Sequence, residues 1–268
     1  MALGDCPMNH RRPWLLPVLV ATGLLFASGG VAAGQQGPPA PPPVIETRLE
    51  APGLDGPRDV VQRVLQLPAG TVVPPHTHPG PNFNTLIEGD VTLTMEGSDQ
   101  PKHAGDSWIE PPNIVHYGLV GPNGARLITA TLVPAAAPQA ELADPTGLTV
   151  PSGPPPPTAV AETRTSAPEL SGDRDVVNDL LVYPPGVVVR PHIHPGPNFV
   201  TLVDGSITLT RPASDGDTVY EAQANWTEQP DELHWAVVGD DGAMLFTSTV
   251  VPRGEPRAVP QPAPEDQP

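Results

Sequence analysis

The stretch that decides the fold is HTHPGPNF, from His76 to Phe83, which recurs as HIHPGPNF from His192 to Phe199. The separation is 192 − 76 = 116 residues. Further along, the pattern Trp-x-Glu that precedes His116 recurs before His234, at 234 − 116 = 118 residues after a two-residue insertion. Self-similarity of this length indicates two copies of one structural unit within the chain.

The residues around these motifs predict short strands. Residues 60–67 and 176–182 are rich in β-branched and apolar side chains, and each run ends at a Pro-x-Gly turn. Residues 88–90 place a glycine between two further runs, as in a hairpin. Residues 127–133 and 244–251 read as closing strands, and no long stretch has helical periodicity. The sequence therefore predicts an all-β protein of jelly-roll-like barrels.

Proline marks the boundaries between the predicted units. The chain has 41 prolines and 26 glycines in 268 residues, and the prolines gather in three stretches. Stretches of that composition form extended connectors rather than packed cores. We predict a signal peptide at 1–33, a Pro-rich segment at 34–43, a first barrel domain at 44–133, a Pro-rich linker at 134–160, a second barrel domain at 161–252 and a Pro-rich acidic tail at 253–268.

The N-terminus has the features of an export signal. Arg11 and Arg12 precede an apolar run at 14–27, and small residues at 31–33 offer a cleavage site. The run is short for a membrane span, so we expect cleavage and a secreted or periplasmic protein with no span; an uncleaved anchor is the alternative. Cys6, the only cysteine, precedes the run, so the mature chain would have no thiolate metal site.

The net charge of −17 argues against one class of partner. An acidic surface repels phosphate backbones, so we expect no nucleic acid and take a small molecule as the partner. The two domains could pair with each other within the chain, or the protein could form a homodimer.

Six of the eight histidines fall at equivalent places in the two copies. Alternate residues of a strand project to one face, so His76 and His78 point together, and His116 lies far enough along to arrive from another strand. Imidazoles at this density suit divalent transition metals. The alternatives are that the histidines only make hydrogen bonds, or that one copy has lost its metal.

These motifs resemble those of the cupin superfamily. Gly70, the His-x-His pair and Gly89 follow the first cupin motif, and the segment from Gly105 through Pro111 to His116 follows the second. The resemblance implies a bicupin, two tandem cupin barrels with a metal at the centre of each. The second copy matches at Gly186, His192, His194, Gly205 and His234.

The chain departs from the family at the position of the metal-binding glutamate. Asn82 stands there in the first copy and Asn198 in the second. An amide oxygen is a poorer ligand than a carboxylate, so we expect neutral three-histidine sites, with the asparagines either coordinating weakly or only hydrogen-bonding to backbone. The candidate metal ligands are His76, His78, Asn82, His116, His192, His194, Asn198 and His234.

The carboxylates near the third histidine are the candidate catalytic groups. Glu110 and Glu228 each lie two residues after a tryptophan, on the same face of a strand. Either could orient a histidine or act as a general base, or could simply be exposed. The tryptophans are expected to be core residues.

A three-histidine site resembles the iron sites of some cupin dioxygenases more than the manganese site of oxalate-degrading bicupins. We therefore expect an oxygenase-type enzyme that uses iron on a small anionic or chelating substrate, with zinc, nickel, copper or manganese as alternatives. A noncatalytic module that binds or senses a small molecule such as a sugar is the second hypothesis. A metal-dependent isomerase or lyase is the third, because fold alone does not settle function.

Overall fold

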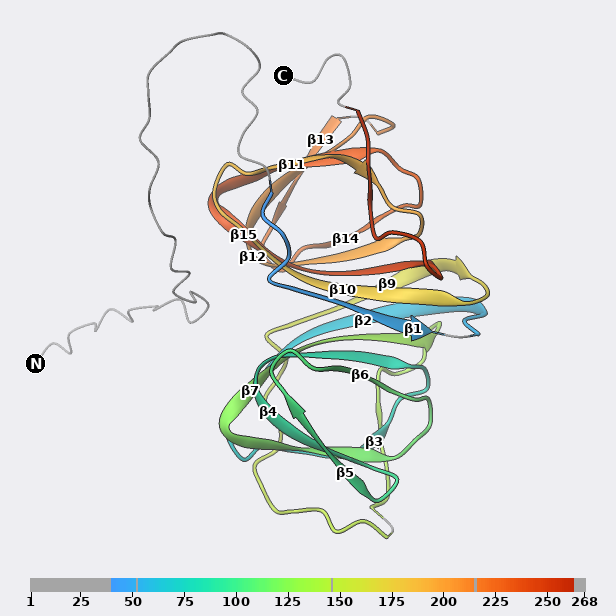
Figure 1. Ribbon diagram of the computed structural model, residues 1–268, viewed down its shortest axis with the longest axis vertical. Helices are drawn as coiled ribbons and strands as arrows, with labels where there is room; N and C mark the ends of the chain where they lie inside the picture. The colour runs from blue at the N-terminus through green and yellow to red at the C-terminus, as the bar shows by residue number, and fades with distance from the viewer. Residues whose placement is uncertain (1–39, 52, 146, 215, 263–268) are drawn as a thin grey trace, which may run out of the picture. The chain divides into compact units, whose positions relative to one another are not determined.

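The computed structural model describes residues 40–51, 53–145, 147–214 and 216–262 (Figure 1). The predicted signal peptide and most of the Pro-rich segment at 34–43 lie outside these residues. The described part of the chain consists of strands and loops, and it holds no helix that could cross a membrane. The prediction of an all-β protein is confirmed.

Each copy of the repeat supplies seven consecutive strands. The first copy contains β2 (Gly56–Leu67), β3 (Val72–Thr77), β4 (Asn82–Met95), β5 (Ser98–His103), β6 (Ser107–Glu110), β7 (His116–Pro134) and β8 (Glu141–Leu142). The second contains β10 (Arg174–Tyr183), β11 (Val188–Ile193), β12 (Asn198–Arg211), β13 (Gly216–Glu221), β14 (Asn225–Glu228), β15 (His234–Pro252) and β16 (Val259–Pro260). In both, the long central pair, β4 with β7 and β12 with β15, is antiparallel.

Each set of seven strands, with one further strand from the other copy, forms an eight-stranded sheet that curls into a jelly-roll-like barrel (Figure 1). In the first, the hydrogen-bonded order is β5-β4-β7-β2, and β3 and β6 attach to β7 and β4. Shifts of register within β4 and β7 bend the sheet, as expected of bulges in a closed barrel. The order in the second barrel is equivalent.

The eighth strand of each barrel comes from the other side of the predicted domain boundary. Strand β1 (Ile45–Ala51) pairs with β10 of the second barrel, and β9 (Ala161–Leu170) pairs with β2 of the first. The predicted domain 44–133 therefore donates its first strand, and the domain 161–252 does the same. The exchange covers an edge strand in each sheet, and it is the form that the expected intramolecular pairing takes.

The two Pro-rich segments do more than connect. After β7 and β15 the chain continues in two straps, residues 135–142 and 253–260, each of which lines the cavity of its own barrel. Each strap ends in a short strand, β8 against β3 and β16 against β11. Periodicity cannot detect a strap, because only two residues of each pair with the sheet.

An apolar cluster lies between the barrels and fixes the orientation of the inner strands. Phe83 and Phe199 are fully buried in it, next to residues of both copies. Because side chains alternate along a strand, a phenylalanine that faces the other barrel places Asn82 and Asn84 inside its own barrel. The cluster comprises Ala51, Leu54, Val60, Phe83, Leu132, Leu170, Val176, Phe199 and Val250.

The turn before β4 and β12 requires glycine. A Cβ on Gly80 would lie 2.0 Å from the carbonyl oxygen of Leu132, and one on Gly196 would lie 2.1 Å from that of Val250. Only glycine allows the backbone to approach so closely. The turn holds His78 against the start of β4.

Candidate metal centres

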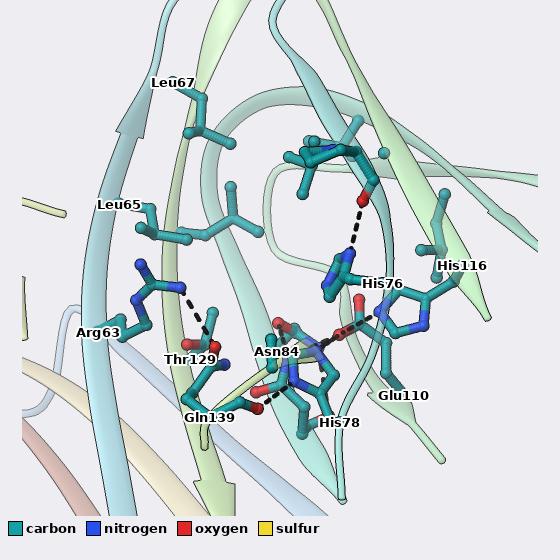
Figure 2. Close-up of a pocket in the computed structure, with 18 of the residues that line it drawn as sticks. Arg63, Leu65, Leu67, His76, His78, Asn84, Glu110, His116, Thr129 and Gln139 are labelled. Carbon is teal, nitrogen blue, oxygen red and sulfur yellow. Dashed lines mark hydrogen bonds and ion pairs between the residues drawn. The ribbon is translucent and has the colours of Figure 1, made fainter. Parts of the chain in front are cut away.

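Three histidines and one glutamate meet inside each barrel. In the first, one ligand atom from each of His76, His78, Glu110 and His116 lies within 4.8 Å of all the others (Figure 2). They come from β3, the turn after it, the end of β6 and the start of β7. The equivalent group in the second barrel is His192, His194, Glu228 and His234.

Hydrogen bonds to backbone orient the imidazoles. Each Nδ1 lies 2.7 or 2.8 Å from a carbonyl oxygen, which can only accept, so Nδ1 carries the hydrogen and Nε2 keeps its lone pair. Metal-binding histidines are held in this way. The acceptors in the first barrel are the carbonyls of Pro74, Gln139 and Ile114, and those in the second are Arg190, Arg257 and Glu232.

Glu110 completes the ligand set. Its Oε2 lies 3.2 Å from His78 Nε2 and 3.3 Å from His116 Nε2. His116 Nε2 is buried and has no aligned hydrogen-bond partner among the described residues, so its lone pair points into the cluster. Three imidazoles and a carboxylate fit a divalent transition metal such as iron or manganese.

The expectation of a neutral three-histidine site is therefore corrected. Asn82 donates from Nδ2 to Glu110 Oε2 at 2.6 Å, and its Oδ1 accepts from Thr131 Oγ1 at 2.7 Å. A carboxylate only accepts, so the amide nitrogen must face Glu110 and the amide oxygen faces away from the cluster. Asn82 positions the carboxylate instead of acting as a ligand, and Asn198 does the same for Glu228, at 2.6 Å.

The register of two strands explains how the carboxylate reaches the site. Asn82 on β4 lies directly opposite Glu110 on β6. The family pattern places a carboxylate at the position of Asn82 on β4. In this chain the candidate carboxylate ligand, Glu110, comes from the neighbouring strand β6. Trp108, on the same face of β6, donates from Nε1 to Glu110 Oε1 at 3.0 Å. The tryptophan is buried as expected, and it also fixes the carboxylate.

Burial and neighbouring charges shift the pKa values of the cluster in different directions. Burial alone would raise the pKa of Glu110, but the interactions with the neighbouring His116 and His78 outweigh it and lower that pKa well below its usual value. Burial would lower the pKa of His116, but Glu110 raises it. Burial and the neighbouring histidines lower the pKa of His76 to about 4. The site thus keeps an ionised carboxylate.

The second centre repeats this geometry closely. Glu228 Oε2 lies 3.0 Å from His194 Nε2 and 3.3 Å from His234 Nε2. Trp226 Nε1 donates to Glu228 Oε1 at 3.0 Å, and Thr249 donates to Asn198 at 2.9 Å. Both copies therefore hold the same four candidate ligands in the same arrangement.

A cavity opens from each centre, and the two cavities differ. The first has a volume of about 230 Å³ and the second about 610 Å³. Apolar side chains such as Leu65 and Leu67 form much of the first wall (Figure 2). Arg63, Gln139 and Arg257 also line the cavities, and sequence analysis missed all three. Gln139 and Arg257 are separated by 118 residues, the same offset that relates His116 to His234. This offset is the sequence signal that could have identified them as equivalent positions.

Comparison with known proteins identifies the fold. Residues 63–128 match the model of the cupin domain family. Oxalate decarboxylase from Bacillus subtilis has a similar structure, with a TM-score of 0.51 and 14% identity over 85% of each chain. A mutant of it gives a TM-score of 0.54 at 14% identity, over 76% of this chain and 71% of that one.

A third structure of that enzyme, from a study of its Mn(II) centres, gives a TM-score of 0.51 at 12% identity, over 82% of this chain and 80% of that one. No curated protein sequence matches the chain significantly. At these identities the likeness concerns the fold. The family match lies within the first barrel, and the likeness to these structures shows that the chain shares their fold.

Proposed function

We propose that this chain is an exported, metal-dependent enzyme of the oxygenase type that acts on a small anionic or chelating molecule. The observation that carries the proposal is the duplicated cluster, in which three Nε2 atoms and one carboxylate oxygen converge beside a cavity. Iron and manganese are the proposed metals, since the glutamate adds a hard oxygen ligand to the imidazoles. Residues 1–33 remain the proposed export signal.

The protein's own groups support such chemistry. A bound divalent metal would supply Lewis acidity and open positions for substrate oxygens. Glu110 stays ionised and offsets part of the charge of the dication, while Trp108 and Asn82 hold the carboxylate in place. The apolar cavity wall restricts water around the reacting group. A glutamate that held the metal in this way would not be free to act as a general base.

A lyase reaction is the second candidate. It is favoured by the three-histidine, one-glutamate set and by the fold shared with a decarboxylase whose Mn(II) centres have been studied. In this case the substrate would be a small carboxylic acid that loses carbon dioxide. Such a reaction would release carbon dioxide without net consumption of oxygen.

The test begins with the metal. The full chain, produced with iron and with manganese, should contain about two metal ions per chain by elemental analysis. Replacement of His76 and His192 by alanine should remove both. The matched control is His103→Ala, because His103 lies on β5 beside Asp90, away from the centres. Purified protein that contains no transition metal under any of these conditions would refute the proposal.

Turnover then separates the candidate functions. A panel of small carboxylic acids should be supplied to the metal-loaded protein, with oxygen uptake and carbon dioxide release measured together. Uptake coupled to product supports the oxygenase, and release without uptake supports the lyase. Binding of a small molecule with no consumption in either measurement would favour the noncatalytic module instead.

A further inference from the structure

The two cavities differ in the placement of one arginine. Arg63 on β2 lies opposite Thr129 and, across the exchanged strand, opposite Glu162. The same place in the second barrel, opposite Thr247 and Glu46, is taken by Asp179. The strap reverses the pattern, since Gln139 lines the first cavity and Arg257 the second. Of these two positions, one in each barrel is therefore an arginine. It lies on β2 in the first barrel and on the strap in the second.

Arg63 presents its guanidinium to the first cavity. Its Nε lies 2.9 Å from Glu162 Oε2, so the exchanged strand anchors one side of the group. Its Nη1 lies 3.4 Å from Gln139 Oε1, at the long limit of a hydrogen bond. Figure 2 shows the guanidinium directed toward Gln139 and Thr129, across the cavity wall from the histidines.

The hydroxyl of Thr129 is another polar group on the same cavity wall. Thr129 is 3% exposed and lines the cavity, and its Oγ1 has no hydrogen-bond partner among the described residues. A buried hydroxyl without a partner is costly, so its position beside a guanidinium indicates a place prepared for a polar ligand. In the second barrel the equivalent Thr247 instead donates to Asp179, at 3.4 Å.

The second cavity engages its arginine with carboxylates of the protein. Arg257 Nη1 lies 2.8 Å from Asp179 Oδ2, and its Nε lies 3.6 Å from Glu46 Oε2. Two negative groups therefore face one guanidinium, and Asp179 is fully buried behind it. Arg190 also lines this cavity, but it is exposed, where solvent and salt screen its charge.

We propose that Arg63, assisted by Thr129, binds the carboxylate of a small anionic substrate in the first cavity, and that the buried Asp179 makes the second cavity selective against such anions. The proposal rests on the proposed function and names the substrate class and the site that takes it. A guanidinium binds a carboxylate through paired, charge-assisted hydrogen bonds, which are strong in an apolar surrounding. The smaller volume of the first cavity fits a small acid.

The experiment titrates malonate, with neutral malonamide as control, into metal-loaded protein by calorimetry. The wild-type chain should bind about one malonate, and malonamide should bind far more weakly. Arg63→Gln should weaken malonate binding at least about tenfold, and Arg63→Lys by less, because it keeps the charge without the planar fork. Thr129→Val should weaken it by several fold, because the hydroxyl is lost at constant shape.

The matched control is Arg126→Gln, since Arg126 also pairs with a glutamate, Glu88, in the same barrel but outside the metal cavity. It should bind malonate as the wild type does. Asp179→Asn should raise the number of bound malonates toward two, because it removes one of the two carboxylates that face Arg257. Unchanged affinity in Arg63→Gln, or an equal loss in Arg126→Gln, overturns the role of Arg63. Unchanged stoichiometry in Asp179→Asn overturns the selectivity of the second cavity.

Failure of this inference is distinguishable from failure of the proposed function. Metal content and turnover are measured on the same variants. Metal and turnover retained with malonate binding indifferent to Arg63 overturn only the inference. A chain that binds no metal refutes the proposed metal-dependent enzyme. In that case, titration of malonate into the metal-free protein still measures how Arg63→Gln changes the affinity for malonate.

Discussion

At the scale of single residues, the pair Asn82 and Glu110 defines the centre. The two side chains lie opposite each other on β4 and β6, and the amide donates to the carboxylate at 2.6 Å. The family pattern identifies the position on β4 but says nothing of its neighbour. The carboxylate is therefore present in the centre, on the other strand of the pair.

This arrangement predicts that the carboxylate of the first centre can be supplied from β4 instead of β6. Glu110→Asn should lower metal affinity in the first centre by roughly 10- to 100-fold, because a charged ligand is lost. Adding Asn82→Glu restores both the carboxylate and the total side-chain volume, so the double variant should recover much of the affinity. Metal stoichiometry and competition with a chelator measure both effects. A double variant no better than the single one would contradict the exchange of ligand position.

A second residue, Asp179, predicts a dependence of stability on pH. Burial raises its pKa to about 6 from the usual 3.8 of an aspartate, despite the opposing charge of Arg257. The folded protein thus holds this proton more tightly than the unfolded chain, so the contribution of Asp179 to stability is greatest below pH 4 and is lost as pH rises to about 6. The loss is about 3 kcal/mol for a shift of this size.

The measurement compares wild type with Asp179→Asn in urea at several pH values. The free energy of unfolding of the wild type should fall relative to that of the variant between about pH 4 and 6. Above this range the difference should be constant. Parallel curves for the two proteins over the whole range would show that the pKa of Asp179 is the same in the folded and unfolded states.

At the scale of elements, the straps matter as much as the barrel strands. The carbonyl of Arg257 accepts the Nδ1 hydrogen of His194 at 2.7 Å, and that of Gln139 serves His78 in the first barrel. Each strap therefore fixes one ligand through its backbone, whichever side chain it carries. The segments expected to be connectors are part of both centres.

Truncation of the second strap should affect one centre alone. A chain ending at Pro252 loses the carbonyl that orients His194, so the second centre should lose metal affinity by about tenfold or more while the first keeps its metal. A chain ending at Gln261 retains β16 and its pairing with β11, and it should behave as the full chain. Equal metal content in the two truncated chains would show that the strap does not support the centre.

At the scale of the whole molecule, the two repeats depend on each other. Arg48 of β1 pairs with Asp175 at 2.6 Å, and Arg164 of β9 pairs with Asp59 at 2.8 Å. Gln62 also donates to the carbonyl of Phe199, at 3.2 Å. Together with the shared apolar cluster, these contacts make the barrels a single folding unit.

A fragment of residues 40–145 should therefore not form a stable monomer. It lacks β9, so β2 would have an open edge, and the phenylalanine that packs across the interface would be exposed. Since its own β1 is equivalent to β9, two fragments could exchange β1 and dimerise. Light scattering after size-exclusion chromatography should show dimers or aggregates, whereas the full chain serves as control. A folded monomeric fragment would contradict this interdependence.

The sequence by itself determined the duplication, the all-β class and the six histidines. These follow from local signals, namely strand periodicity, turn residues and the spacing of a repeated motif. Such signals survive in a single sequence because each depends on residues close to one another in the chain.

Only the tertiary structure showed that Glu110 and Glu228 join the candidate ligands, that β1 and β9 are exchanged and that the straps carry site residues. The first depends on register between strands, the second on which of two equivalent sheets receives a strand, and the third on a segment with no periodicity. Each is a contact between distant parts of the chain. The identical Glu-Thr-Arg motifs of β1 and β9 show the reason most clearly, because local sequence cannot distinguish two partners that look the same.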